Sequence, residues 1–321
     1  TVYVVKIKAV GDGENFADSD WSEFGFNEIF KYTLLADGSG YEVNLSVSSV
    51  ELQDRKVVVP STYENLPVTR IADKMFYKCA SLTEVVLPNT LKEIGANAFY
   101  NCDALESIEL PESVTAIGSG AFMHCSSLKK IVVPTGIERI ESIMFSDCTS
   151  LTEVVLPSTL KEIRGMAFLG CIALENIELP ASVTAIGSIA FGGCSSLKKI
   201  VVPTGVERIE GSTFVGCSNL TEVVLPSTLK EIMGMAFRKC EALKTVILPS
   251  SLEDIGKDAF YMCPLESLFF DGTEAEFLSV SVAEGNDSVL NAAVYFYSET
   301  EPTENPQKFW RYSGGKPLPW A

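Results

Sequence analysis

Nine cysteines are the residues of this chain most suited to disulfide, metal or redox chemistry. They follow one another at intervals of 23 residues: Cys79, Cys102, Cys125, Cys148, Cys171, Cys194, Cys217, Cys240 and Cys263. Metal and redox sites usually join cysteines at short spacing, as in C-x-x-C, and this chain has no such pair and a single histidine. Equivalent cysteines of stacked repeats would lie about 5 Å apart, but their parallel side chains do not suit a disulfide. We therefore expect buried thiols that pack as small apolar groups, with no metal and no cofactor.

The single histidine, His124, does not complete a catalytic group. Other copies fill its repeat position with lysine, asparagine, aspartate, glycine or methionine, a range typical of a solvated surface. Gly118-Ser119-Gly120 lies in a repeat turn without the strand and helix that flank a phosphate-binding loop. Because no nucleophile and base can be paired, the sequence predicts a protein that is not an enzyme. The catalytic alternative is a hydrolase with its site in the flanking segments, near Trp21 or Trp310.

The 23-residue period that places the cysteines also predicts the architecture, because a fixed period of about 20 to 50 residues is typical of a solenoid. The stretch from Leu151 to Cys171, LTEVVLPSTLKEIRGMAFLGC, is a representative copy. Alternation in its first strand turns Glu153 and Val155 outward, and Pro157 ends that strand. The segment 165–171 is too short for a stable helix, so we expect a turn or a single helical turn. The expected core positions of the copy are Val154, Leu156, Leu160, Ile163, Ala167, Phe168 and Cys171.

The segments on either side of the repeats are expected to cover the open ends of the solenoid. We divide the chain into an N-terminal β cap (1–55), the repeat solenoid (56–263) and a C-terminal cap and tail (264–321). Residues 37–40, Asp-Gly-Ser-Gly, predict a hairpin. Thr273 with Glu276 three residues later predicts a capping box that starts a short helix.

Composition restricts the partners. The net charge is −17, and the two flanks are proportionately more acidic than the repeats, which argues against nucleic acid and anionic lipid. No apolar run is long enough to span a membrane, so we expect no membrane insertion. The start, TVYVVKIKAVGDGENF, carries no targeting segment, but the chain begins without methionine, so a removed secretion signal stays open.

The outward positions of the first strand in each coil are the candidate ligand-binding residues. Strands about 4.8 Å apart would align their side chains in two ladders. From coil to coil the two positions are Glu84 and Val86, Ser107 and Glu109, Lys130 and Val132, Glu153 and Val155, Asn176 and Glu178, Lys199 and Val201, Glu222 and Val224, and Thr245 and Ile247. Two interpretations stay open: the charges only satisfy one another, or the exposed valines between them form a protein-binding face.

The repeat C-x-x-L-x-x-V-x-L-P-x-x-L-x-x-I-G-x-x-A-F-x-x-C, as from Cys79 to Cys102, resembles the BspA-like type of bacterial leucine-rich repeat. The resemblance covers roughly residues 30–321. It implies a mainly β, right-handed leucine-rich-repeat solenoid of about nine coils with short helical turns, and no catalytic residues. It also implies a secreted or cell-surface location and adhesion to host or bacterial macromolecules. Four coils depart from the pattern where the family usually has glycine: Glu141, Arg164, Glu210 and Met233.

The leading hypothesis is therefore a non-enzymatic protein-binding or cell-adhesion module, extracellular or on the bacterial cell surface. Its partner would be a host or bacterial surface protein. The alternative is an intracellular, cytoplasmic structural scaffold that keeps its thiols reduced. The residues upstream of Thr1 would separate the two, and the sequence does not predict the oligomeric state.

Overall fold

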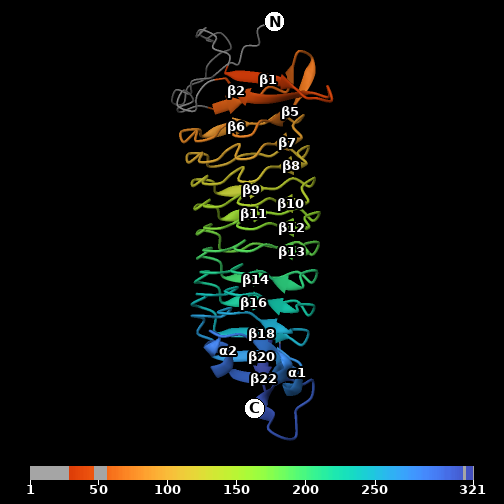
Figure 1. Ribbon diagram of the computed structural model, residues 1–321, viewed down its shortest axis with the longest axis vertical. Helices are drawn as coiled ribbons and strands as arrows, with labels where there is room; N and C mark the ends of the chain where they lie inside the picture. Colours follow the sequence, from red (N-terminus) through yellow and green to blue (C-terminus); the bar gives the residue numbers. More distant parts are fainter. Residues whose placement is uncertain (1–28, 47–55, 314–315, 321) are drawn as a thin grey trace.

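The chain forms one elongated column of stacked coils, with the N-terminal hairpin at one end and the C-terminal sheet at the other (Figure 1). The computed structural model describes residues 29–46, 56–313 and 316–320. The strand that the alternating residues VYVVKIKAV would predict, the site near Trp21 and the boundary at residue 55 lie outside these residues. The column is a β-solenoid of about 11 turns. The solenoid prediction is thus confirmed, with more turns than the expected nine.

One long side of the column carries the first strand of each coil. From β3 to β23 the paired strands are parallel and in register, so that Val154 lies beside Ile131, one coil earlier, and the last strand, β24, pairs antiparallel with β23. In two coils the strand is reduced to an isolated bridge, at Ser107 and at Asn176. The strands of this side are β3 (Lys56–Val58), β6 (Glu84–Val86), β9 (Lys130–Val132), β11 (Glu153–Val155), β14 (Lys199–Val201), β16 (Glu222–Val224), β18 (Thr245–Pro249), β20 (Ser267–Asp271), β22 (Ala293–Tyr297), β23 (Phe309–Ser313) and β24 (Lys316–Pro319).

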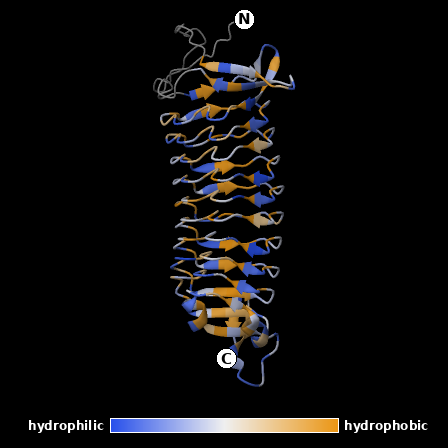
Figure 2. Ribbon diagram, in the orientation of Figure 1, coloured by the Kyte–Doolittle hydropathy of each residue, from blue (hydrophilic) through white to orange (hydrophobic). Residues whose placement is uncertain are grey.

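The second side is formed by shorter strands, most of them two residues long. They also pair in parallel, as Ile163 does with Ile140 and Ile186. Within the coils, hydrophobic stretches of the ribbon alternate with hydrophilic ones (Figure 2). The strands of this side are β5 (Leu66–Ile71), β7 (Glu93–Ile94), β8 (Ala116–Ile117), β10 (Arg139–Ile140), β12 (Glu162–Ile163), β13 (Ala185–Ile186), β15 (Arg208–Ile209), β17 (Glu231–Ile232), β19 (Asp254–Ile255) and β21 (Ser281–Val282).

Two turns join the strands within each coil. After β11 the Leu160 N–H donates to the Pro157 carbonyl oxygen at 3.0 Å, which closes the first turn. The segment 165–171 is a run of hydrogen-bonded turns, as predicted, and contains no α-helix. It holds two left-handed residues, Met166 at φ 59° and Gly170 at φ 70°. The same two positions are left-handed in every coil from residue 74 to residue 262, so each coil bears a local conformational cost.

A stack of phenylalanine rings fills the core beside these turns. Rings of successive coils lie 5.1 to 5.7 Å apart between centroids and within 17° of parallel. Phe168 is fully buried, as are Leu160, Ile163, Ala167 and Cys171. The expected core residues are thus inside, except that Leu156 is only half-buried against the core.

The cysteine thiols from Cys102 to Cys263 lie next to the phenylalanine stack and donate hydrogen bonds across coils. Cys171 Sγ lies 3.1 Å from the Phe145 carbonyl oxygen, and the same bond recurs from Cys102 to Cys263 at 2.9 to 3.3 Å. All nine cysteines are free and buried. Burial raises the pKa of Cys125 and Cys217 to about 12 and that of Cys79 to about 11. These three thiols are therefore structural groups with little thiolate character.

At the N-terminal end, β1 (Phe30–Leu34) and β2 (Tyr41–Leu45) form the predicted hairpin. β2 then pairs in parallel with β5, which extends the second side of the column. The sequence of the first coil has a five-residue insertion between Pro60 and Arg70, because Pro60 and Pro88 are 28 residues apart where later prolines are 23 apart. In this segment β4 (Thr62–Tyr63) forms a smaller hairpin with the start of β5. The end of the solenoid is thus covered by paired strands, which leaves less open edge.

At the C-terminal end the coils continue past Cys263 without the repeat signature. Helix α1 (Glu274–Ser279) begins with the predicted capping box, in which the Glu276 N–H donates to Thr273 Oγ1 at 3.3 Å. Helix α2 (Asp287–Asn291) leads into β22, and the 3₁₀ helix η2 (Pro306–Lys308) precedes β23. Trp310 is fully buried and donates its indole N–H to the Phe270 carbonyl oxygen at 3.0 Å, so this part of the tail is docked on the solenoid. The division into three segments stays a prediction.

Replacing Phe168 by alanine is expected to lower the free energy of unfolding by about 3 to 5 kcal/mol, because it leaves a cavity in the middle of the stack. The exposed Val155→Ala is the control and should change it by less than about 0.5 kcal/mol. Chemical denaturation followed by circular dichroism measures both. Equal effects of the two substitutions would contradict the role of the stack.

The nine thiols are expected to resist a thiol-specific reagent in the folded protein at pH 8 and to react in denaturant. Burial disfavours the thiolate, so a pKa of about 12 at Cys125 leaves far less reactive form than an exposed thiol has. Cys79, with a pKa of about 11, should react before Cys125 and Cys217 as the pH rises. An added surface thiol, Val155→Cys, provides the positive control. Native labelling of the nine at the rate of that control would show that the core opens.

Candidate binding surface

The described residues offer no arrangement typical of a metal site. No group of three or more histidine, cysteine, aspartate or glutamate side chains in residues 29–46, 56–313 and 316–320 could hold an ion. Over the same residues, no helix has the length and apolar character needed to cross a membrane.

His124 occupies one of the two left-handed positions of its coil, with φ 60°. Its Nδ1 lies 3.8 Å from Asp147 Oδ2, and its ring meets Tyr100 edge-on with centroids 5.5 Å apart. The left-handed backbone explains why this position is filled so often by glycine, asparagine or aspartate. The sequence indicated a surface position correctly but did not show this backbone constraint.

The predicted site residues lie together on the outward side of the first strands. We call the line that runs through Val155 the valine column, and the line two residues earlier, through Glu153, the charge column. The valines of the column are 40 to 47% exposed, which is high for side chains in a sheet: Val58, Val86, Val132, Val155, Val201 and Val224. At the C-terminal end the column meets Phe269, which is buried against Tyr295 and Trp310.

The charge column is a series of ion pairs between neighbouring coils. Lys130 Nζ lies 2.7 Å from Glu153 Oε1, and Lys199 Nζ lies 2.6 Å from Glu222 Oε1. Lys56 pairs with Glu84 in the same way. Ser107 and Asn176 stand between successive pairs. The charges of this column thus satisfy one another, at about 0 to 1 kcal/mol per exposed pair.

A third line of charges, one residue before the charge column, is paired as well. Lys129 Nζ lies 2.6 Å from Glu106 Oε2, and Lys198 Nζ lies 2.6 Å from Glu175 Oε2. The hydrogen bond from Lys129 holds the pKa of the Glu106 carboxyl below its usual value. The valine column is therefore bordered by charges that are already neutralised within the chain.

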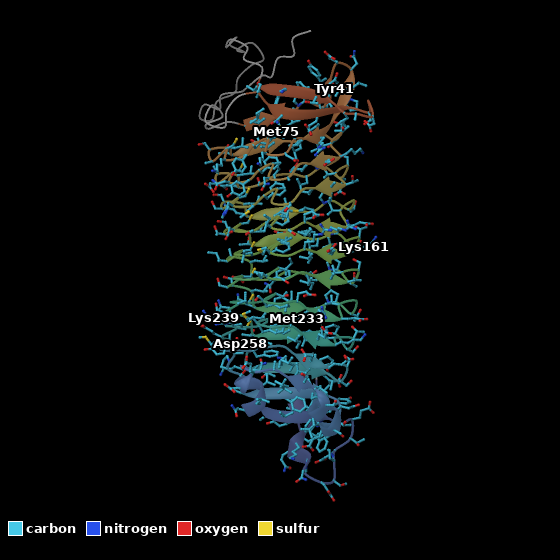
Figure 3. All side chains as sticks on the ribbon, viewed as in Figure 1. Tyr41, Met75, Lys161, Met233, Lys239 and Asp258 are labelled. Carbon is cyan, nitrogen blue, oxygen red and sulfur yellow. The ribbon has the colours of Figure 1, made fainter. Side chains whose placement is uncertain are left out.

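Other side chains project from the remaining edges of the column. Lys161, on the second side, and Lys239, in a cysteine turn, lie at opposite edges (Figure 3). Lys161 pairs with Glu138 at 2.8 Å. Arg164 and Glu141, two of the residues that replace glycine, pair at 2.8 Å. These departures from the repeat are thus accommodated by an ion pair at the surface.

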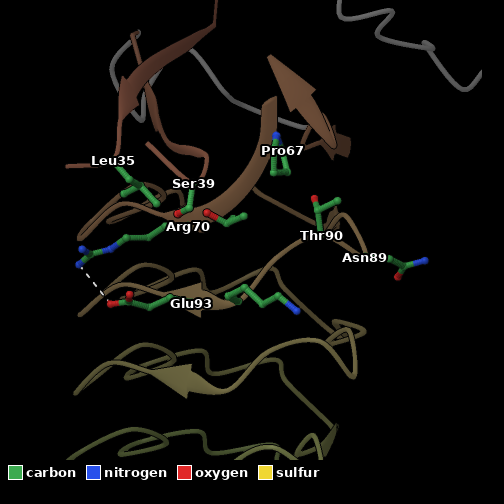
Figure 4. A pocket seen from close by; sticks show the side chains of 9 residues that line it. Leu35, Ser39, Pro67, Arg70, Asn89, Thr90 and Glu93 are labelled. Carbon is green, nitrogen blue, oxygen red and sulfur yellow. Dashed lines mark ion pairs between the residues drawn. The ribbon is translucent and has the colours of Figure 1, made fainter. Parts of the chain in front are cut away.

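The sequence did not predict an open groove between the N-terminal hairpin and the second side (Figure 4). Its volume is about 670 Å³, and it is lined by Leu35, Ser39, Pro67, Thr69, Arg70, Asn89, Thr90, Lys92 and Glu93. The Arg70 guanidinium contacts Glu42 at 3.2 Å and Glu93 at 3.3 Å, so its charge is already paired. None of the predicted site residues lines this groove, and the five-residue insertion in the first coil was its one signal in the sequence.

Comparison with known proteins gives the family. The profile described as BspA type leucine rich repeat region matches residues 59–175 and 162–280, with six copies. No protein with curated annotation matches the chain.

Solved structures of three bacterial proteins are similar. A leucine rich cell surface protein from Faecalibacterium prausnitzii is 23% identical, with TM-score 0.48 over 83% of this chain and 100% of that chain. A T. pallidum leucine rich repeat protein is 28% identical, with TM-score 0.39 over 75% and 90%. A leucine-rich repeat protein from Bacteroides ovatus is 26% identical, with TM-score 0.34 over 91% and 100%. Since the family profile spans residues 59–280, more than half of the chain, the chain belongs to the BspA-type leucine-rich repeat family.

Proposed function

We propose that the chain is a non-enzymatic protein-binding module that uses the valine column as its contact surface. The observation that carries the proposal is the row of valines, each 40 to 47% exposed, on an in-register sheet. Apolar side chains gathered on one face are typical of an interaction surface. A partner would remove these valines from water without breaking the flanking ion pairs, whose members face each other along the sheet.

The rigidity of the coil stack favours this use. Backbone hydrogen bonds and stacked rings join each coil to the next, as between Phe145 and Phe168 at 5.4 Å. The side chains of the face are therefore held in place before a partner arrives, which reduces the entropy lost on binding. A flat, preorganised face without a deep pocket suits a protein partner more than a small molecule.

The partner we propose is a protein on a host or bacterial surface, which makes the chain an adhesion module that is secreted or displayed on the cell. The resemblance to the BspA-like family supports this location. The nine free thiols would also suit an intracellular scaffold. They do not favour it, however, because buried thiols with raised pKa values withstand an oxidising exterior.

Replacing both Val155 and Val201 by aspartate is expected to abolish the capture of a partner from extracts of host matrix and of neighbouring bacterial surfaces. Each new carboxylate would replace an apolar contact with the partner, so a charge would be buried where the unmodified face is apolar. The double variant should fold, because both valines are exposed. Affinity pull-down followed by mass spectrometry provides the measurement.

The matched control is Ala116→Asp with Ala185→Asp, which adds the same charge at exposed positions of the second side. This control should capture the same partner as the unmodified chain. If the unmodified chain captures nothing that the valine variant loses, the valine column is not the contact surface.

A further inference from the structure

Two glutamates interrupt the valine column. Glu109 takes the place of a valine between Val86 and Val132, and Glu178 does so between Val155 and Val201. Both glutamates are exposed, and each has valines as its neighbours on the adjacent coils. The contact surface therefore places two carboxylates within an otherwise apolar line.

These two carboxylates differ from the other charges on this face. The lysines of the neighbouring columns, such as Lys129 and Lys130, are each bound to a glutamate at 2.6 to 2.7 Å. Glu109 and Glu178 form no ion pair with any residue that the structure describes. Since the repeats supply a lysine partner to their other strand glutamates, these two are left for a cation from outside the chain.

The distance between the two carboxylates follows from the repeat. Glu109 and Glu178 are three coils apart, and a strand spacing of about 4.8 Å makes this about 14 Å. Val132 and Val155 lie between them. Along this line the surface is thus anionic at Glu109, apolar at Val132 and Val155, and anionic again at Glu178.

We propose that the partner docks on this line with an extended segment that carries two lysines or arginines four residues apart and an apolar residue midway. In an extended chain, four residues span about 14 Å, and alternate side chains face the same way. The two cations would meet Glu109 and Glu178 while the apolar residue covers Val132 and Val155. In an α-helix, about nine residues cover this distance, which turns the second cation to the opposite side.

This arrangement would select against other partners. A purely apolar segment that covered the line would bury two carboxylates without cations, which is unfavourable. An acidic segment would be repelled. The inference rests on the proposed function, because it assigns a partner chemistry to the same valine column.

The test is the binding of two synthetic peptides with the same composition, one containing Lys-Thr-Val-Thr-Lys and the other Thr-Lys-Val-Lys-Thr. Titration of each into the protein with isotopically labelled valine methyl groups reports the contact by the shifts of Val132 and Val155. We expect the first peptide to bind at least about five-fold more tightly, as two exposed ion pairs would allow. Glu109→Gln with Glu178→Gln should remove this preference.

The matched control is Glu106→Gln with Glu175→Gln, which changes the net charge equally on the same two coils but removes glutamates that are already paired. It should keep the preference for the first peptide. Equal binding of both peptides, or an equal loss in the two double variants, would overturn the inference. These peptide results do not bear on the pull-down with the Val155→Asp and Val201→Asp variant. The protein-binding proposal is therefore tested separately from the inference about the two glutamates.

Discussion

The structure depends on the join between one coil and the next at the phenylalanine carbonyl. The Phe145 oxygen accepts the Cys148 N–H at 3.2 Å, which closes its own turn, and the Cys171 thiol at 3.1 Å, which belongs to the next coil. Both lone pairs of a buried acceptor are thus used. The ring of the same phenylalanine stacks on Phe168. One residue therefore closes a coil and sets its distance from the next, which explains why the spacing of 23 residues is kept from Cys79 to Cys263.

Because the same contact joins every pair of successive coils, equivalent surface residues form straight columns along the stack. Equivalent residues lie beside each other along the whole stack, so a substitution in the repeat acts on its neighbours at a distance of about 4.8 Å. A column of one charge would repel itself at this spacing. The valine column avoids this because most of its members are neutral, and the charge column avoids it because lysine alternates with glutamate. The apolar face is thus a consequence of the register as well as of composition.

Much of the fold could be predicted from the sequence because the same pattern of residues recurs in every coil, so that each copy supports the interpretation of the others. Alternation placed Val154 inside and Val155 outside, and Thr273 with Glu276 indicated the capping box.

The left-handed backbone at Met166 could not be predicted, because closure of the coil imposes it on a residue that does not favour it. The sequence did not predict the turns of the solenoid beyond Cys263, because a side chain there makes a contact that the backbone makes in the repeats. Asn286 Oδ1 accepts the Phe260 N–H at 3.0 Å, whereas a backbone carbonyl of the next coil accepts the equivalent N–H in earlier coils. The site residues were expected on one face with mutual pairing of their charges as one interpretation, whereas the identity of the ion pairs between neighbouring coils required coordinates.

The repeats also follow a longer period of 69 residues, since LTEVVLP begins at residues 82, 151 and 220, so that three types of coil alternate. This longer period explains where the unpaired glutamates lie. In two coils of every three, the charge column carries lysine or glutamate and the valine column carries valine, as at Lys130 and Val132. In the third coil the charge column has Ser107 or Asn176, and the acid stands two residues later. A glutamate in the charge column of that coil would lie beside Lys130, whose ammonium is already bound to Glu153. Moving the acid to the valine column leaves each lysine with one partner and places the surplus carboxylate on the apolar face. The same rearrangement that balances the charge column therefore gives the face its two anionic positions.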